Sequence, residues 1–289
     1  MKTGAEFAFV ILHYLAMDRT ENALKSIREN MVGEKYHVVI VDNASPDRSG
    51  KRLAEVYGDD EDVTVLMSES NLGFAGGNNL GYSWCRDNLD REYICVMNND
   101  AALISPEFAD RVRKIHTETS CAVLGPDIYC PLTGKHQSPS GLDIPTPESV
   151  SSKLNRRRKI NSFFPLGYLT LRKEEAEKRK KVHPKDSWWE TGRENVVLHG
   201  AFYIFCPSFI RNMAVAFEPL GFMYFEEETL AYICNKKGLK MVYSPDIQVY
   251  HYDDRATDRA FGTGYRKARF KSIELEKSMG ALLRYMSEA

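Results

Sequence analysis

Short apolar segments alternate with amphipathic segments through the first half of the chain. The apolar segments are rich in Val and Ile and occupy residues 7–14, 36–45, 63–70 and 92–100. Helix-like segments follow them at residues 20–30, where Thr20 is the expected N-cap, and at 47–58, 75–88 and 106–116. Buried parallel strands are continuous apolar runs with helices on both faces of their sheet. The alternation therefore predicts an α/β fold with a mostly parallel central sheet.

The second half of the chain continues this pattern after an irregular stretch. Pro, Ser and Gly are concentrated between Gly134 and Pro147. Strand-like segments return at residues 195–206 and 240–246, and helix-like segments occupy 226–238 and 264–286. With 289 residues and 43% hydrophobic side chains, we expect a single domain, residues 1–289, that ends in a helix.

The charge balance and the cysteines exclude several classes of protein. A net charge of −1 gives no overall attraction to nucleic acid, and no nucleic-acid-binding motif is present. Six scattered cysteines without a C-x-x-C pair argue against a disulfide framework or a zinc site. The N-terminal apolar stretch is interrupted by His13 and is too short and polar for a signal peptide or a membrane span, so we expect a cytoplasmic protein.

A strongly basic segment lies within an insertion expected at residues 145–192. Residues 153–181 contain eleven Lys or Arg and three Glu, a charge of +8, which leaves −9 for the rest of the chain. The apolar side chains interleaved with these cations are Phe163, Phe164, Leu166, Tyr168 and Leu169. Such a mixture is compatible with peripheral contact with an anionic membrane, and equally with a solvated insertion or an oligomer contact.

Polar side chains form four clusters where predicted elements meet loops. These clusters are Asp42-Asn43, Asn71, Asn98-Asn99-Asp100 and Glu226-Glu227-Glu228. The first three follow consecutive strands, and parallel strands bring their carboxyl ends to the edge where open α/β sheets bind ligands. We therefore expect those three clusters to share one crevice.

A glycine-rich stretch with Gly73, Gly76 and Gly77 follows the third strand-like segment. Glycines before a helix let backbone amides approach a phosphate. The spacing matches neither G-x-G-x-x-G nor a P-loop, and a turn without a ligand would have the same composition. A diphosphate bound here would repel the carboxylate of Asp100 unless a divalent cation lay between them, which makes Asp100 a candidate metal ligand.

Seven short motifs together resemble a known family. In chain order they are VILHY, VVIVDNASPD, NLGFAGGNN, VMNNDA, HGAFYIFCPSF, FMYFEEETL and SPDIQVYHY. The chain resembles family 2 glycosyltransferases, which are inverting enzymes of the GT-A fold with a Rossmann-like sheet. Within them it is most similar to the rhamnosyltransferase-like branch of bacterial surface-polysaccharide enzymes. The resemblance covers most of the chain except residues 145–192.

The resemblance implies a donor site built from the first half of the chain. Asp42 matches the residue that recognises the nucleotide base, and Asn71 and Asn79 match positions that line the nucleotide and the sugar. Asn98 and Asn99 stand next to the metal position, where they can orient its carboxylate or the sugar.

A metal site is also implied. The sequence NND stands in place of the family's D-x-D motif, with Asp100 as its last carboxylate. His251 matches a histidine that often joins the metal, although a histidine at a strand end is more often structural. The implied cofactor is Mn²⁺ or Mg²⁺.

The resemblance makes Glu227 the candidate general base. FEEET occupies the position of a Glu-Asp pair whose second member is the base, and here that member is Glu. A later family carboxylate is replaced by Thr229. Glu226 and Glu228 are close enough in sequence to take the role instead, so the choice among the three stays open.

A basic segment near the C-terminus has two interpretations. Arg255, Arg259 and Lys267 follow His251 in a stretch with two glycines. They could fold over a diphosphate as a lid, or they could form a solvated basic face.

The resemblance implies transfer of one sugar from a nucleoside-diphosphate sugar to a saccharide or a lipid-linked saccharide, in cell-surface polysaccharide synthesis. Residues 1–130 would bind the donor and residues 131–289 the acceptor, at the inner face of the cell membrane. The alternatives are a catalytically silent sugar-nucleotide-binding or scaffold protein and a sugar nucleotidyltransferase.

Overall fold

The computed structural model describes residues 3–4, 6–180, 187–252 and 264–288. Its centre is a mixed ten-stranded sheet in which the order β10-β12-β8-β11-β6-β2-β3-β4 is extended by β7 beside β12 and β9 beside β8. These strands are β2 (Phe7–His13), β3 (Tyr36–Asp42), β4 (Val63–Met67), β6 (Tyr93–Asn98), β7 (Ala101–Leu103), β8 (Val123–Cys130), β9 (Lys135–His136), β10 (Arg193–Glu194), β11 (Phe202–Phe205) and β12 (Met241–His251). Two short strands, β1 (Thr3–Gly4) and β5 (Leu89–Asp90), pair separately.

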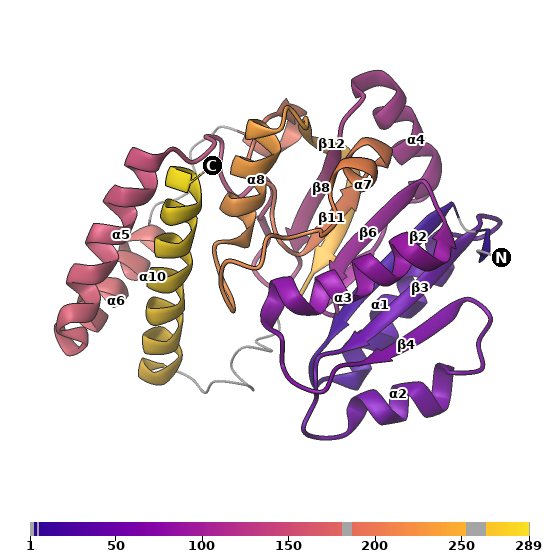
Figure 1. The fold of residues 1–289 in the computed structure, drawn as a ribbon, viewed down its shortest axis with the longest axis horizontal. Helices are drawn as coiled ribbons and strands as arrows, with labels where there is room; N and C mark the ends of the chain where they lie inside the picture. The colour runs from indigo at the N-terminus through magenta and orange to yellow at the C-terminus, as the bar shows by residue number, and fades with distance from the viewer. Residues whose placement is uncertain (1–2, 5, 181–186, 253–263, 289) are drawn as a thin grey trace.

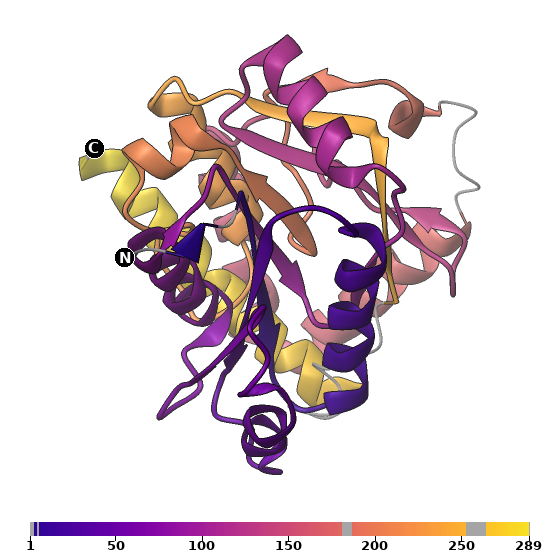
Figure 2. The ribbon, with the colours of Figure 1, turned by 90° about the vertical axis from the view of Figure 1, so that its right-hand side faces the viewer.

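Helices cover both faces of the sheet, as predicted (Figure 2). One face carries α1 (Met17–Asn30), α2 (Ser49–Tyr57) and α4 (Phe108–Thr119). The other face carries α3 (Gly73–Asn88), α7 (Pro207–Asn212) and α8 (Glu226–Lys236). Alternate residues of each strand enter the two cores, so that Phe9 packs on one side and Val10 on the other.

The predicted parallel core is confirmed, with one antiparallel strand inside it. β4, β3, β2 and β6 are neighbours and parallel, whereas β11 lies antiparallel between β6 and β8. β11 is shorter than the strand predicted at residues 195–206. Before it, Val197 pairs instead with Gly141 in an isolated bridge outside the named strands.

A third group of helices lies beside the sheet, at the far left of Figure 1. It consists of α5 (Pro147–Ser162), α6 (Phe164–Lys180) and α10 (Tyr265–Glu288). Val150 and Leu154 of α5 pack against Met279 and Leu282 of α10, and Phe225 connects this small core to α8. The basic segment is therefore largely a helical hairpin held against the C-terminal helix. None of the helices in the described ranges is long and apolar enough to cross a membrane.

Candidate active site at the carboxyl edge of the sheet

The sheet topology brings several strand ends to one edge. β2, β3, β4 and β6 are parallel, so their carboxyl ends lie together. β11 is antiparallel to β6, which places the residues before it next to the end of β6. The amide of Asn98 donates a hydrogen bond to the carbonyl of Ala201 at 3.0 Å. β12 ends at the same edge, because it is parallel to β8 and β8 is antiparallel to β11.

Asp100 and His251 form a close pair at this edge. β7 pairs with β12 so that Ala101 lies opposite His251, and Asp100 Oδ1 is 3.3 Å from His251 Nε2. The other ring nitrogen, Nδ1, donates to Gln137 Oε1 at 2.7 Å. That bond orients the ring so that Nε2 faces the carboxylate, and the two atoms could share a cation.

The chemistry of this pair suits part of a metal-binding shell. A carboxylate oxygen and an imidazole nitrogen suit Mn²⁺, and the oxygen suits Mg²⁺. Across the described ranges of the chain, there is no group of three His, Cys, Asp or Glu side chains that could hold an ion alone. A metal bound by Asp100 and His251 therefore needs further ligands, and the oxygens of a bound diphosphate are suitable ones.

His199 lies next to this pair and was not singled out from the sequence. Its ring centroid is 5.5 Å from that of His251. Burial lowers the pKa of His199 to about 3, and the nearby His251 acts in the same direction, so the ring is neutral near pH 7. Its Nδ1 accepts a hydrogen bond from the Ala201 amide at 3.2 Å. The available signal was its place in the HGA motif, directly before β11.

A pocket of about 310 Å³ opens beside His199. Asn98 lines it from the end of β6, and three glutamates line it from the start of α8. α10 contributes Lys271 and Leu275 to the wall. The remaining lining residues are Phe74, Gly200, Ala201, Met223, Tyr224 and Phe225. The pocket thus joins the strand-end edge to the helical layer.

Glu227 is the glutamate whose carboxylate has the best-defined surroundings. It accepts a hydrogen bond from the amide of Gly200. A Cβ on residue 200 would lie 2.6 Å from Glu227 Oε1, so glycine is needed for this close approach. Burial raises the pKa of Glu227, whereas the Gly200 amide and the charge of Lys271 favour its ionised form.

The two neighbouring glutamates, Glu226 and Glu228, have raised pKa values. Burial, together with the charge of Glu227, raises the pKa of Glu226 to about 8 and that of Glu228 to about 7. Oε1 of Glu226 is buried and has no hydrogen-bond partner among the described residues. Glu226 is therefore protonated at neutral pH, and Glu227 is better placed than Glu226 to accept a proton there.

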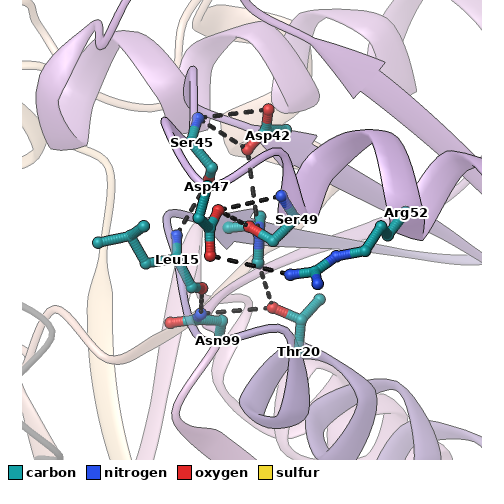
Figure 3. A network of polar contacts seen from close by, with 9 residues as sticks. Leu15, Thr20, Asp42, Ser45, Asp47, Ser49, Arg52 and Asn99 are labelled. Carbon is teal, nitrogen blue, oxygen red and sulfur yellow. Dashed lines mark hydrogen bonds and ion pairs between the residues drawn. The ribbon is translucent and has the colours of Figure 1, made fainter.

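Asp42 is buried at the end of β3, with only 2% of its surface exposed. The amide of Ser45 approaches its two carboxylate oxygens at 3.2 and 3.4 Å (Figure 3). A Cβ on Gly50 would lie 2.1 Å from Asp42 Cγ, so the glycine in α2 leaves room for the carboxylate. Asp42 is thereby fixed in one orientation at the sheet edge.

A chain of hydrogen bonds joins the loop after β6 to the loop after β3 (Figure 3). Asn99 Nδ2 donates to Thr20 Oγ1 at 3.3 Å, and Thr20 donates to His13 Nδ1 at 2.6 Å. His13 Nε2 donates to Ser49 Oγ at 2.8 Å, and Ser49 donates to Asp47 Oδ1 at 2.6 Å. Burial lowers the pKa of His13 and keeps its ring neutral. Thr20 therefore belongs to this network, inside α1, and the prediction that it caps the helix is wrong.

Asn71 and Asn79 connect segments of backbone. Asn71 Oδ1 accepts from the Gly73 amide at 2.9 Å and from Asn43 Nδ2 at 3.1 Å, which fixes the turn into α3. Asn79 Nδ2 donates to the Phe217 carbonyl at 2.7 Å, and its Oδ1 accepts from the Phe217 amide at 2.9 Å. The contacts of Asn79 thus tie α3 to the segment after α7.

The glycine-rich stretch is explained by close packing. α3 begins at Gly73, so Gly76 and Gly77 lie inside the helix and not in a loop. A Cβ on Gly77 would lie 2.5 Å from Leu12 Cδ1, which indicates that α3 packs tightly on β2. Gly73 has a φ of +72°, and a Cβ there would lie 2.0 Å from the carbonyl oxygen of Phe222.

The structure places only part of the predicted basic lid. Lys267 lies in the first turn of α10. Arg255 and Arg259 fall outside the described residues.

Comparison with known proteins identifies the family. The sequence model of glycosyl transferase family 2 matches residues 9–179. This is more than half of the chain, so the chain belongs to glycosyl transferase family 2. The match extends through most of the basic segment, contrary to the expectation that residues 145–192 would lie outside the resemblance. Glu227 and His251 lie beyond the matched residues, so the match does not assign their roles.

One similar curated protein is the low-salt glycan biosynthesis hexosyltransferase Agl10 of Haloferax volcanii. It is 28% identical over 123 residues, which are 43% of this chain and 36% of that protein. The chain therefore aligns with about a third of the relative's length.

Several solved structures share the GT-A fold. One is the mannosyltransferase PcManGT of Pyrobaculum calidifontis in complex with GDP-Man and Mn²⁺, with a TM-score of 0.51 at 13% sequence identity. Its alignment covers 98% of this chain and 75% of the mannosyltransferase chain. GalNAc-T7 with UDP, GalNAc and Mn²⁺ has a TM-score of 0.53 at 12% identity, and the alignment covers 86% of this chain and 44% of that one. TarS 1–349 of S. aureus with UDP has a TM-score of 0.52 at 12% identity, and the alignment covers 85% of this chain and 60% of that one.

Proposed function

We propose that this chain is an inverting, metal-dependent glycosyltransferase that moves one sugar from a nucleoside-diphosphate sugar to an acceptor hydroxyl. The observation that carries the proposal is that the pocket of Glu227 adjoins the Asp100–His251 pair. Asn98 and His199 line the pocket of Glu227, and His199 also lies against the Asp100–His251 pair. A base and a cation-binding pair on one crevice are what displacement of a diphosphate by a hydroxyl requires.

The donor is assigned to the strand-end edge. A divalent ion held by Asp100 and His251, Mn²⁺ or Mg²⁺, would offset the charge of the diphosphate leaving group. Asn98 is assigned to orienting the donor sugar, because it lines the pocket and stands two residues before Asp100. Asp42 would accept a hydrogen bond from the nucleotide base in the orientation fixed by the Ser45 amide.

Other residues of the expected donor site have different support. The amides of Asn71, Asn79 and Asn99 are bonded within the protein, so we assign them to shaping the site and not to direct contact. Lys267 remains a proposed contact to the diphosphate, together with Arg255 and Arg259, on the strength of their order in the sequence.

The acceptor is assigned to the pocket of about 310 Å³. Glu227 accepts the proton of the acceptor hydroxyl as that oxygen attacks the anomeric carbon. The Gly200 hydrogen bond and Lys271 favour the ionised carboxylate before the proton is taken. Attack from the face opposite the leaving group inverts the anomeric configuration in a single displacement.

The remaining parts of the proposal concern substrates and place. Within a single domain, we assign the donor mainly to residues 1–130 and the acceptor mainly to residues 131–289, with His251 and the basic residues after it completing the donor site. The acceptor is a saccharide or lipid-linked saccharide of cell-surface polysaccharide synthesis, as in the rhamnosyltransferase-like branch. The site of action is the cytoplasm or the inner face of the cell membrane, where nucleotide sugars are available.

A panel of nucleoside-diphosphate sugars tests this function. Incubation with Mn²⁺ or Mg²⁺ should release a nucleoside diphosphate from one donor, by transfer or slow hydrolysis, and EDTA should stop the release. Release of pyrophosphate from a nucleoside triphosphate and a sugar phosphate would instead identify a nucleotidyltransferase. Donors that raise the melting temperature without any turnover, in the presence of saccharide acceptors, would identify a silent sugar-nucleotide-binding protein.

A further inference from the structure

Three large apolar side chains are exposed where α5 turns into α6. Phe163, Leu166 and Leu169 have 61%, 62% and 61% of their surface exposed. Leu166 and Leu169 are three residues apart on α6, so they share one side of the helix next to Phe163. This turn lies at the outer end of the helical layer, on the far side of α10 from the sheet (Figure 1).

Exposed cations occur on each of the helices that meet at this turn. Lys159 precedes the turn on α5, and Lys173 lies seven residues after Leu166, which returns it to the same side of α6. Arg172 is also exposed, and Arg269 of α10 is exposed beside Phe163.

The three consecutive arginines of α5 have a different role. Arg156 forms an ion pair with Glu174, and Arg158 Nε lies 3.8 Å from Glu276. Arg157 is partly buried and donates to Ser272 Oγ at 3.1 Å. These arginines are paired with acidic or polar side chains of the hairpin and α10, so we assign headgroup contact to the other exposed cations near the turn.

A hollow of about 360 Å³ continues the apolar group onto α10. Phe163 and Pro165 line it from the turn, and Tyr265 and Ile273 line it from α10. Arg269 is the cation at its wall. The wall of the hollow also carries the polar side chains of Asn161 and Ser162. A hollow of mixed lining with a guanidinium suits a phosphate-bearing headgroup whose lipid chains lie beside exposed Phe and Leu side chains.

α10 connects this surface to the pocket of Glu227. Ile273 and Arg269 face the hollow, whereas Lys271 and Leu275 of the same helix line the pocket. Asn161 of α5 fixes the helix in place, since it donates to the Ser272 carbonyl at 3.1 Å. A substrate anchored in a bilayer at the hollow would therefore lie across α10 from the pocket of Glu227.

We propose that the α5–α6 turn and the adjoining side of α10 form a docking face for an anionic lipid bilayer. Phe163, Leu166 and Leu169 enter the interfacial region, and Lys159, Arg172, Lys173 and Arg269 contact anionic headgroups. The mixture favours a bilayer over a protein partner, because exposed apolar side chains with exposed cations on the same group of helices match a surface that is apolar inside and anionic outside. The use of this face for a lipid-linked acceptor rests on the proposed function, but the docking itself does not.

Sedimentation with phospholipid vesicles tests the docking face. The full chain should bind vesicles of phosphatidylcholine with phosphatidylglycerol at low salt, bind pure phosphatidylcholine far less, and partly dissociate in high salt. Changing Phe163, Leu166 and Leu169 together to Ser should weaken partitioning by about tenfold or more.

A matched variant controls for loss of exposed apolar surface. Three remote side chains are also exposed, and they would be changed to Ser together: Val32, Leu132 and Leu142. This control should bind vesicles like the unchanged protein. Both variants should keep their melting temperature and any stabilisation by a nucleotide sugar, which separates a failure of docking from a failure of the proposed function.

Three results would overturn the docking face. One is the absence of binding to phosphatidylglycerol vesicles at low salt, and another is equal binding to neutral and anionic vesicles. The third is a dimer of the free protein that the Phe163, Leu166 and Leu169 variant dissociates, which would assign the face to a second copy of the chain.

Discussion

Three adjacent glutamates at the start of α8 have different chemical surroundings. Glu227 accepts a hydrogen bond from the Gly200 amide and lies near Lys271. Glu226, in contrast, has a buried carboxyl oxygen without a hydrogen-bond partner among the described residues. Successive residues of a helix point about 100° apart, so one pocket wall offers each of them a different environment. Spacing alone did not separate them, because the distinction depends on a glycine and a lysine distant in sequence.

The state of Glu226 predicts how stability depends on pH. Its pKa rises from 4.5 to about 8 on folding, so the folded protein holds this proton more tightly. The resulting stability is present below pH 4.5 and is lost as the pH rises through 8. Glu226→Gln removes the ionisation and should stabilise the protein by about 2–4 kcal/mol above pH 8, with little effect near pH 5.

Thermal unfolding between pH 5 and pH 9 measures this difference. The melting temperature of the unchanged protein should fall more steeply toward high pH than that of Glu226→Gln. Glu55→Gln, which changes an exposed residue of α2, should follow the unchanged protein. Parallel pH profiles for Glu226→Gln and the unchanged protein would show that the buried carboxyl is not destabilising when ionised.

The Asp100–His251 pair predicts that donor binding depends on a divalent cation. Asp100→Ala removes the oxygen 3.3 Å from His251 Nε2 and should abolish the increase in melting temperature that a nucleotide sugar gives with Mn²⁺. Gln137→Ala leaves both candidate ligands but frees the His251 ring, and should weaken the apparent Mn²⁺ affinity about 10–100-fold. Asp143→Ala, which changes an exposed carboxylate, is the control. An equal increase in melting temperature with nucleotide sugar and Mn²⁺ for Asp100→Ala and this control would contradict a metal role.

At the scale of elements, the pattern of apolar residues predicted the parallel strands and most helices. Continuous runs of Val and Ile are typical of buried strands, and the segments between them have helical periodicity. The pattern did not predict the direction of β11, since an antiparallel strand between two parallel ones has the same apolar pattern. It also left the α5–α6 hairpin undefined. α5 buries only Val150, Leu154 and Ile160, so its apolar stripe is too narrow to stand out among many cations.

The turn into α3 predicts a large effect from a single methyl group. Gly73 has a φ of +72°, and a Cβ there would overlap the carbonyl of Phe222, which is backbone and cannot move aside easily. Gly73→Ala should therefore lower the free energy of unfolding by about 2–4 kcal/mol. Denaturant unfolding measures this loss. Gly141→Ala is the matched control, since its Cβ would lie 3.4 Å from Val197 and should cost far less. Equal stability of the two variants would mean that the turn relaxes.

For the whole molecule, the sequence predicted the edge of the sheet that carries the candidate site, because parallel strands share their carboxyl ends. Asp42, Asp100 and Asn98 could be assigned to that edge from their positions after apolar runs. His199 and Lys271 could not, since they reach the pocket through an antiparallel strand and a distant helix. The packing of α10 against α5 was likewise invisible in local patterns, because it depends on contacts more than a hundred residues apart.

The central claim is that Glu227 acts as the base in a pocket shared with the donor. Its most direct test is turnover of Glu227→Gln, measured as nucleoside diphosphate released from the donor that the unchanged protein uses, with donor affinity measured alongside. We expect turnover to fall about 10²–10⁴-fold while donor affinity stays within about twofold, because the amide keeps the shape and loses the base. Unchanged turnover in Glu227→Gln, or the same loss in Glu226→Gln or Glu228→Gln instead, would contradict this assignment.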